Sequence, residues 1–205
     1  MSTLFLHFQM LGFWHPGTGR GAGPGADALA NRTASGLPYL PGKTVKGLLR
    51  DAAMTAQALG GLTDPDVCKA FGSAYGAAGA GARDEARFAS VPGALRFGSA
   101  HVGATRQEVV AWETWANDAG NAPGRAQMFR SFASTRIDSE TGVAEHGSLR
   151  TIEVVVPLTL IAEIATSDAE LARRVLAASV SHVFAVGAHR TRGLGRCVVT
   201  VVEVP

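Results

Sequence analysis

Three basic side chains gather at the start of one predicted helix. Lys43, Lys46 and Arg50 follow a Pro-Gly pair in GLPYLPGKTVKGLLRD, residues 36–51. Spacings of three and four residues place them on one helix face. Cations at a helix N-terminus oppose the helix dipole, and the first backbone N–H groups there lack partners. A phosphate held at the helix mouth, beside Thr44, would remove both problems. The alternative is an ordinary solvated basic face.

A nucleotide-binding P-loop is excluded by the spacing in the same stretch. That motif is a glycine, four residues and then Gly-Lys-Ser/Thr. Gly42, Lys43 and Thr44 match its end, but five residues separate Gly36 from Gly42. Pro41 also has no N–H group to offer to a phosphate.

A second basic stretch lies near the C-terminus, in GAHRTRGLGR, residues 187–196. Gly193 and Gly195 allow the backbone to approach a ligand closely. Arg190 and Arg192 add positive charge beside them, and guanidinium groups favour forked contacts to phosphate. The two basic stretches together predict two phosphate-binding sites, which we expect on one edge of a sheet.

Composition limits the classes of protein that this chain can be. Its 205 residues suit one domain, and 46% of them are hydrophobic, which is enough for a core. A net charge of +2 excludes a uniformly basic nucleic-acid-binding protein. The two cysteines, Cys68 and Cys197, predict neither a disulfide framework nor a zinc cluster. The N-terminal segment shows no basic leader and no membrane span, so we expect a cytoplasmic protein with no membrane partner.

Hydrophobic periodicity predicts the order of helices and strands. Residues 15–36 form a glycine-rich loop that is too poor in apolar side chains to pack a core. The long helix should bury one face from Val45 to Leu59 and end at Gly60. Pro157 places its strand at a sheet edge or a bulge. The other expected elements are a strand at 3–13, a short helix and loops at 64–89, a strand at 94–101, a helix at 105–116, a hairpin at 136–149, a strand at 151–165, a helix opened by a Ser167–Glu170 capping box and a strand at 197–204.

Several segments together carry a family resemblance. They are LPYLPGKTVKGLLRDA from residue 37, CKAFGS from residue 68, ALRFGSAHV from residue 94, RIDSETGVAEHGSL from residue 136 and GAHRTRGLGRCVVTVVEV from residue 187. The chain resembles the RAMP superfamily of CRISPR-associated proteins, especially the backbone subunits of type III effector complexes. The resemblance implies an α+β fold with a ferredoxin-like (RRM-like) βαββαβ core, in a single domain over residues 1–205. It also implies a helical insertion at about 104–135 and a thumb hairpin at about 136–149.

The same resemblance implies binding of a guide RNA, the crRNA. Copies of the chain are expected to stack along the guide beside other effector subunits, and each thumb to interrupt the duplex of guide and target RNA. Phosphate contacts hold an RNA without reading its sequence, as this role requires. The expected RNA-binding residues are Lys43, Thr44, Lys46, Arg50, Arg32, Arg136, Arg190, Arg192, Gly193 and Gly195.

Some backbone subunits of this family also cut the bound target RNA, through an aspartate after the first strand. The matching stretch is GADALANR, residues 25–32, and Asp27 is the only carboxylate before Asp51. The resemblance thus implies that Asp27 takes part in cleavage with a divalent ion, Mg²⁺ or Mn²⁺. His15 is another candidate for the general base, because imidazole titrates near neutral pH. The alternative is that Asp27 is an exposed loop aspartate with no catalytic role.

Two other functions stay open at this point. One is a stand-alone guide-processing endoribonuclease with His15 as its base, although such proteins usually contain two ferredoxin-like units and this chain shows one. The other is a catalytically silent structural or capping subunit with the same fold. Only an activity measurement separates the silent subunit from the cleaving one.

Overall fold

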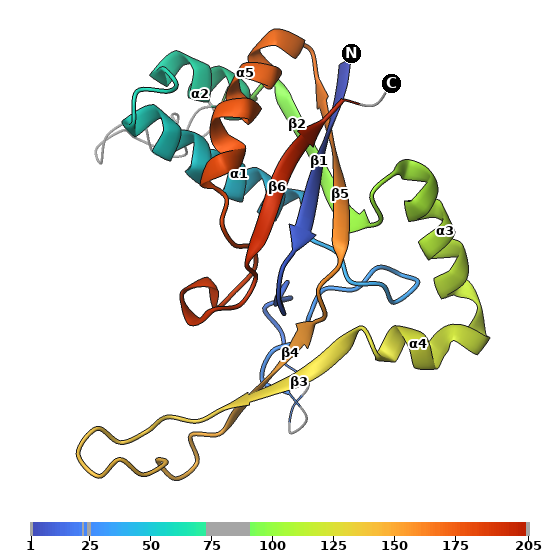
Figure 1. The fold of residues 1–205 in the computed structure, drawn as a ribbon, viewed down its shortest axis with the longest axis vertical. Helices are drawn as coiled ribbons and strands as arrows, with labels where there is room; N and C mark the ends of the chain where they lie inside the picture. The colour runs from blue at the N-terminus through green and yellow to red at the C-terminus, as the bar shows by residue number, and fades with distance from the viewer. Residues whose placement is uncertain (1, 22, 24–25, 73–90, 204–205) are drawn as a thin grey trace.

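The computed structural model describes residues 2–21, 23, 26–72 and 91–203. Its core is a four-stranded sheet with helices packed against it (Figure 1). The core elements are β1 (Ser2–Met10), α1 (Gly42–Ala58), β2 (Leu95–Val102), β5 (Thr159–Thr166), α5 (Ala169–Ser179) and β6 (Cys197–Val202). The strand order is β2-β5-β1-β6, and all neighbouring strands are antiparallel. This arrangement confirms the predicted ferredoxin-like βαββαβ core.

Apolar periodicity explains how β1 and α1 build that core. The alternating side chains of β1 that face the helices are all buried, namely Leu4, Leu6, Phe8 and Met10. The buried side chains of α1 are Val45, Leu48, Leu49, Ala52, Ala53 and Ala56. Leu59 is 72% exposed, so the prediction that it extends this face is wrong. The reason is that α1 has ended, and Gly60 turns the chain with a φ of +82°.

The strand predicted at 151–165 is two strands that belong to different sheets. β4 (Arg150–Val155) pairs with β3 (Phe129–Ser134) in a separate two-stranded sheet, whereas β5 belongs to the core sheet. Pro157 lies between them and ends a strand, instead of marking an edge or a bulge. The thumb hairpin is consequently longer than 136–149. That range is only its tip, and its stem includes β3, which the sequence placed in the insertion at 104–135.

The tip of the thumb is closed by a turn that Asp138 organises. The Asp138 carboxylate accepts hydrogen bonds from the Thr141 N–H at 2.8 Å, the Thr141 hydroxyl at 2.9 Å and the Glu140 N–H at 3.0 Å. These bonds, that of the Thr141 N–H first, hold the pKa of Asp138 below its usual range. All side chains at 136–147 are exposed, and Figure 1 shows the hairpin protruding from the molecule. The tip therefore buries nothing in the core.

Three of the remaining α-helices in the described residues begin at side-chain caps. In the insertion, α3 (Arg106–Asn117) confirms the helix predicted at 105–116, and η3 (Ala119–Asn121) and α4 (Ala122–Ala126) lead into β3. In α5, Asp168 accepts a hydrogen bond from the Leu171 N–H at 3.0 Å. The capping box predicted between Ser167 and Glu170 is therefore wrong, because the cap is the side chain of Asp168. α2 (Asp64–Phe71) is the short helix expected after α1, and residues 73–89 of the segment predicted at 64–89 lie outside the described residues.

A hydrogen-bonded ion pair ties α2 to α5. Asp66 forms a capping box with Thr63 at the start of α2, and Arg174 of α5 donates to Asp66 Oδ1 at 2.6 Å. The bond from the Thr63 hydroxyl, followed by that from Arg174, lowers the pKa of Asp66 to about 2. The pair joins two helices that lie on the same side of the sheet (Figure 1).

The described part of the loop at 15–36 packs against β4, although the sequence predicts a loop that cannot pack. The Asp27 N–H donates to the Thr151 carbonyl at 2.7 Å, and the Glu153 N–H donates to the Ala28 carbonyl at 2.9 Å. Ala30 is only 3% exposed. Backbone hydrogen bonds to the outer edge of β4 thus hold a loop that has few apolar side chains.

Candidate nucleic-acid interface

A polar groove lies where the thumb meets the loop at 187–196. This thumb groove has a volume of about 590 Å³ and is lined by Arg136 and Arg150 of the thumb and by Arg192 of the loop. Arg136 pairs with Glu145, with 3.2 Å between Nε and Oε2. Within the described ranges, no acidic side chain pairs with Arg150 or Arg192. The groove therefore offers two uncompensated guanidinium groups, which are well suited to phosphate.

The loop at 187–196 is anchored to the base of the thumb. Leu194 packs against two buried residues of β4 and against Ala28, in a small apolar cluster separate from the main core. The Gly195 N–H donates to the Phe13 carbonyl at 2.7 Å. These contacts hold Arg192 beside the thumb, so the thumb and the loop that form the groove are linked.

The two glycines predicted to approach a ligand have different roles. Gly193 has a φ of +86° and open space around it, so it stays a candidate for close contact with an RNA backbone. Gly195 is buried, and a Cβ atom there would collide with the carbonyl oxygen of Val186. Gly195 therefore allows the loop to pack on its own backbone, and the prediction that it faces a ligand is wrong.

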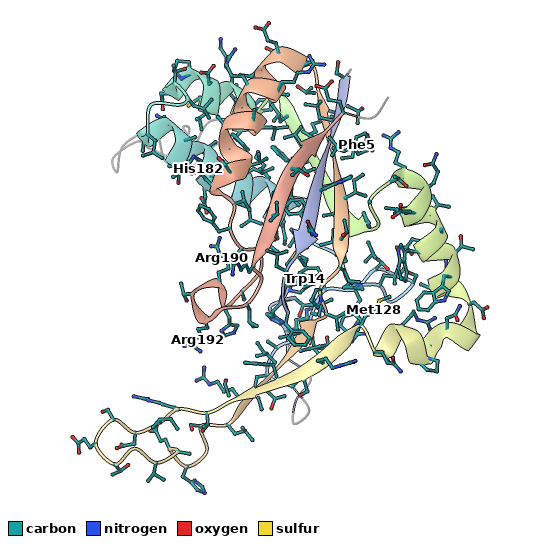
Figure 2. The ribbon with its side chains drawn as sticks, viewed as in Figure 1. Phe5, Trp14, Met128, His182, Arg190 and Arg192 are labelled. Carbon is teal, nitrogen blue, oxygen red and sulfur yellow. The ribbon has the colours of Figure 1, made fainter. Side chains whose placement is uncertain are left out.

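Arg190 and Arg192 belong to one short turn but border different grooves. The turn is η5 (Arg190–Arg192), and it follows His189, which has a left-handed φ of 58°. Arg192 lines the thumb groove, whereas Arg190 lines a second groove of about 370 Å³ against α1, the helix groove. Figure 2 shows both arginines on the same side of the molecule as His182. A strand that crossed η5 would therefore meet positive charge on both sides of it.

The basic stripe of α1 faces away from the loop at 187–196. Asp51 and Thr55 are the α1 residues with polar side chains that border the helix groove. Lys46 lies nine residues before Thr55, which is about two and a half helical turns, so the two side chains point to opposite flanks. Lys43 and Arg50 share the flank of Lys46. The α1 stripe and Arg190 therefore do not line the same groove, and phosphate binding by both basic stretches at one sheet edge stays a prediction.

The mouth of α1 is not the open anion site that the sequence predicts. The Gly42 N–H donates to the Ser99 hydroxyl at 3.1 Å, and the Thr44 N–H donates to the Pro41 carbonyl at 2.8 Å. A Cβ atom on Gly42 would lie 2.5 Å from a backbone oxygen of β2, so the helix start is pressed against that strand. These N–H groups already have protein partners. Phosphate contacts by the α1 stripe remain a prediction that concerns its side chains only.

Asp27 lies exposed at the base of the thumb. Its Oδ2 accepts a hydrogen bond from the Thr151 N–H at 2.7 Å. Thr151 directly follows Arg150, which lines the thumb groove. The candidate catalytic carboxylate is thus fixed on the edge of β4. The residue that holds it, Thr151, is next in the chain to Arg150, a candidate phosphate contact.

His15 is buried beneath the same strand. The residue is 2% exposed, and its Nδ1–H donates to the Glu153 carbonyl at 2.5 Å. A carbonyl can only accept, so this bond assigns a proton to Nδ1. The His15 carbonyl accepts from the Ala188 N–H at 2.9 Å, and the ring centre of His189 lies 6.3 Å away. His15 therefore joins the base of the thumb to the loop at 187–196.

Arg32 contacts the thumb from the loop that carries Asp27. Its guanidinium pairs with Glu153, with 2.5 Å between the two groups, and lies 3.4 Å from the ring centre of Phe129. The second Glu153 oxygen accepts from the Ala30 N–H at 3.0 Å. Arg32 thus holds the loop of Asp27 on the thumb, and its contact with RNA stays a prediction.

A divalent ion would find the carboxylate of Asp27 near the thumb groove, which Glu145 also lines. Within the ranges that the structure describes, no three His, Cys, Asp or Glu side chains are grouped to hold a metal ion. The single carboxylate of Asp27 suits an ion such as Mg²⁺, which commonly takes one or two carboxylates and completes its coordination with water and phosphate oxygens.

No helix in the described part of the chain has both the length and the apolar character needed to cross a membrane.

Similarity to known proteins identifies the family. The model of the RAMP superfamily matches residues 7–198, which include most of the core sheet. The chain belongs to the RAMP superfamily. This RAMP chain is similar to a chain in the cryo-EM structure of type III-B Cmr-beta in the apo state, with a TM-score of 0.68, 12% identity and 98% of each chain covered. It is also similar to a chain of type III-B Cmr-beta bound to cognate target RNA, with a TM-score of 0.72, 10% identity, and coverage of 98% of this chain and 97% of the other. Both similarities support the RAMP fold. No curated protein matches the sequence.

Two groove residues of this RAMP chain are absent from the sequence-based prediction. Arg150 lines the thumb groove, and its position directly after the hairpin predicted at 136–149 is a signal that could have identified it. Phe184 lines the helix groove and is 72% exposed. A phenylalanine between valine and alanine suggests a core position, so only the folded surface identifies it.

Proposed function

We propose that this RAMP chain is a guide-RNA-binding backbone subunit of a type III CRISPR effector complex. The observation that carries the proposal is the thumb groove, where Arg150 and Arg192 face one cavity without acidic partners among the described residues. Membership of the RAMP superfamily supports it, as do similar folds in type III-B Cmr-beta, once with cognate target RNA bound. The expected partners are guide RNA, target RNA, other effector subunits and further copies of this chain.

Arginine–phosphate contacts suit a subunit that has to hold any guide. They give affinity and register without reading base edges. The linked thumb and loop would hold the phosphates in a fixed geometry, because Leu194 packs on β4 and Gly195 is hydrogen-bonded to the chain after β1. The exposed thumb tip would then project toward the duplex formed by guide and target RNA.

The test of guide binding is the double substitution Arg150→Ala with Arg192→Ala. We expect weaker binding of single-stranded RNA, by the same factor for unrelated sequences. The slope of log affinity against log salt concentration should become shallower by roughly one to two units, because binding releases fewer counterions when phosphate contacts are lost. Fluorescence anisotropy at several salt concentrations measures both quantities. Arg96→Ala, an exposed arginine on β2, is the matched control. Unchanged affinity and slope in the double variant would contradict the proposal.

We further propose that Asp27 takes part in cleavage of the bound target RNA. The ribose 2′-hydroxyl attacks the adjacent phosphorus and the bond to the 5′-oxygen breaks, which leaves a 2′,3′-cyclic phosphate and a 5′-hydroxyl. Asp27 either accepts the 2′-proton or orients a water ligand of the ion. A bound Mg²⁺ or Mn²⁺ would supply stabilisation of the charge that develops on the phosphate. Asp27 is better placed than His15, which is 2% exposed.

The test of cleavage is Asp27→Asn in a complex reconstituted with guide RNA. The amide oxygen of asparagine can still accept the Thr151 N–H, so the loop should keep its position. Target cutting should fall about 100- to 10,000-fold, while guide loading and target affinity are retained. Glu140→Gln, an exposed carboxylate of the thumb tip, is the control. Normal cutting by Asp27→Asn would exclude Asp27, and a wild type that never cuts with Mg²⁺ or Mn²⁺ would favour a silent structural or capping subunit.

A further inference from the structure

Phe184 is an exposed aromatic side chain on a fixed backbone. The side chain is 72% exposed, yet the preceding residue, Val183, is 6% exposed. The Phe184 carbonyl accepts a hydrogen bond from the Cys197 N–H at 3.0 Å, and Ala185 forms a β-bridge with Arg196. An aromatic ring in water is unfavourable, and a ring on a fixed backbone loses little freedom when a ligand stacks on it. The Phe184 ring is therefore well placed for a planar ligand to stack on it.

The helix groove combines the groups that one nucleotide requires. Phe184 offers a face on which a base can stack, and Arg190 offers a cation for a phosphate. Asp51 and Thr55 of α1 line the same cavity of about 370 Å³ and can hydrogen-bond to a base edge. Within the described residues, neither Arg190 nor Asp51 has an ion-pair partner. A purely apolar ligand would leave both charges uncompensated.

We propose that the helix groove binds one unpaired nucleotide, with its base stacked on Phe184 and its phosphate on Arg190. This inference rests on the RNA binding proposed for the thumb groove. The η5 turn separates the two grooves, since Arg192 borders one and Arg190 the other. A strand that leaves the thumb groove across this turn enters the helix groove, along the side of the molecule marked by Arg192, Arg190 and His182 in Figure 2.

The direct test is Phe184→Ala, compared with Phe184→Trp, in the binding of labelled single-stranded RNA by the full chain. Loss of one stacked base should weaken binding about 5- to 150-fold. The salt slope should not change, because no phosphate contact is removed. Phe184→Trp should retain the affinity, since it keeps an aromatic face. Leu59→Ala, at an apolar residue directly after α1 with the same 72% exposure, is the matched control and should leave binding unchanged.

A fully abasic strand of equal length separates stacking from phosphate contact. The wild type should bind it more weakly than the normal strand, and Phe184→Ala should show a smaller difference between the two strands. If Phe184→Ala binds normal RNA as tightly as the wild type, this inference is overturned while the proposed function stands. If the wild type binds no RNA, both are overturned. A change confined to self-association of the chain in sedimentation would assign Phe184 to a protein contact and overturn the inference.

Discussion

The two cysteine thiols lie in different environments. Cys197 is 6% exposed in β6, and burial raises the pKa of its thiol to about 11. Cys68 is exposed on α2, with its Sγ 3.9 Å from Asp64 Oδ2. Alkylating reagents react with the thiolate, so a buried thiol that stays protonated near neutral pH is inert.

Iodoacetamide at neutral pH should therefore modify Cys68 and leave Cys197 intact in the folded protein. Peptide mapping by mass spectrometry measures the two sites separately. Both cysteines should react in denaturant, and Cys68→Ser should take up no label while folded. Labelling of Cys197 under native conditions would show that β6 opens readily to solvent.

Among the helices, α2 and α5 depend on one another through Asp66. The folded pKa of Asp66 is about 2, below the ordinary value of 3.8, because Thr63 and Arg174 hydrogen-bond to its ionised form. A carboxyl group with a lowered folded pKa stabilises the fold at all pH values above its unfolded pKa. That stabilisation is lost as the pH falls through the folded value.

Asp66→Asn should lower the melting temperature at pH 7, because it removes the charge that binds Arg174 and weakens the cap of α2. Between about pH 4 and pH 2 the wild type should lose stability more steeply than the variant, so the two melting curves converge. Thermal unfolding followed by circular dichroism over this range measures both effects. Asp64→Asn, in the same first turn, is the control. Parallel pH profiles would mean that the Asp66–Arg174 pair does not form in solution.

The molecule as a whole consists of a packed core and a protruding thumb. The main hydrophobic cluster joins the core sheet, α1, α2 and α5, and it includes no residue from the thumb tip at 136–147. The tip is held by its own turn around Asp138. The core therefore provides the stability of the fold, and the thumb tip protrudes without contributing to the core.

Replacing residues 139–147 by a short glycine linker should leave the melting temperature nearly unchanged. The same variant should disturb the stacking of subunits or the geometry of the guide–target duplex in an assembled complex. Thermal unfolding of the isolated chain and electron microscopy of the complex measure the two outcomes. Replacement of Leu49, which is fully buried, by alanine is the contrasting control and should cost about 2–5 kcal/mol. Global unfolding of the linker variant would place the hairpin in the core.

Local patterns in the sequence were sufficient for the buried faces of β1 and α1. Alternation in β1 and helical spacing in α1 each depend on neighbouring residues, so the buried faces could be read directly. The basic character of the loop at 187–196 and the position of the thumb tip were likewise visible. These features follow from residue type and spacing, which folding does not change.

The grouping of the site, by contrast, was decided by the tertiary structure. Arg192 meets Arg150 because the loop before β6 packs on β4, a contact between segments far apart in sequence. Lys46 points away from the helix groove because helical geometry turns it to the other flank of α1, and Gly195 allows the loop to pack on its own backbone. Spacing along a chain predicts which residues share a face of one element, but strand pairing and packing between elements decide which faces meet.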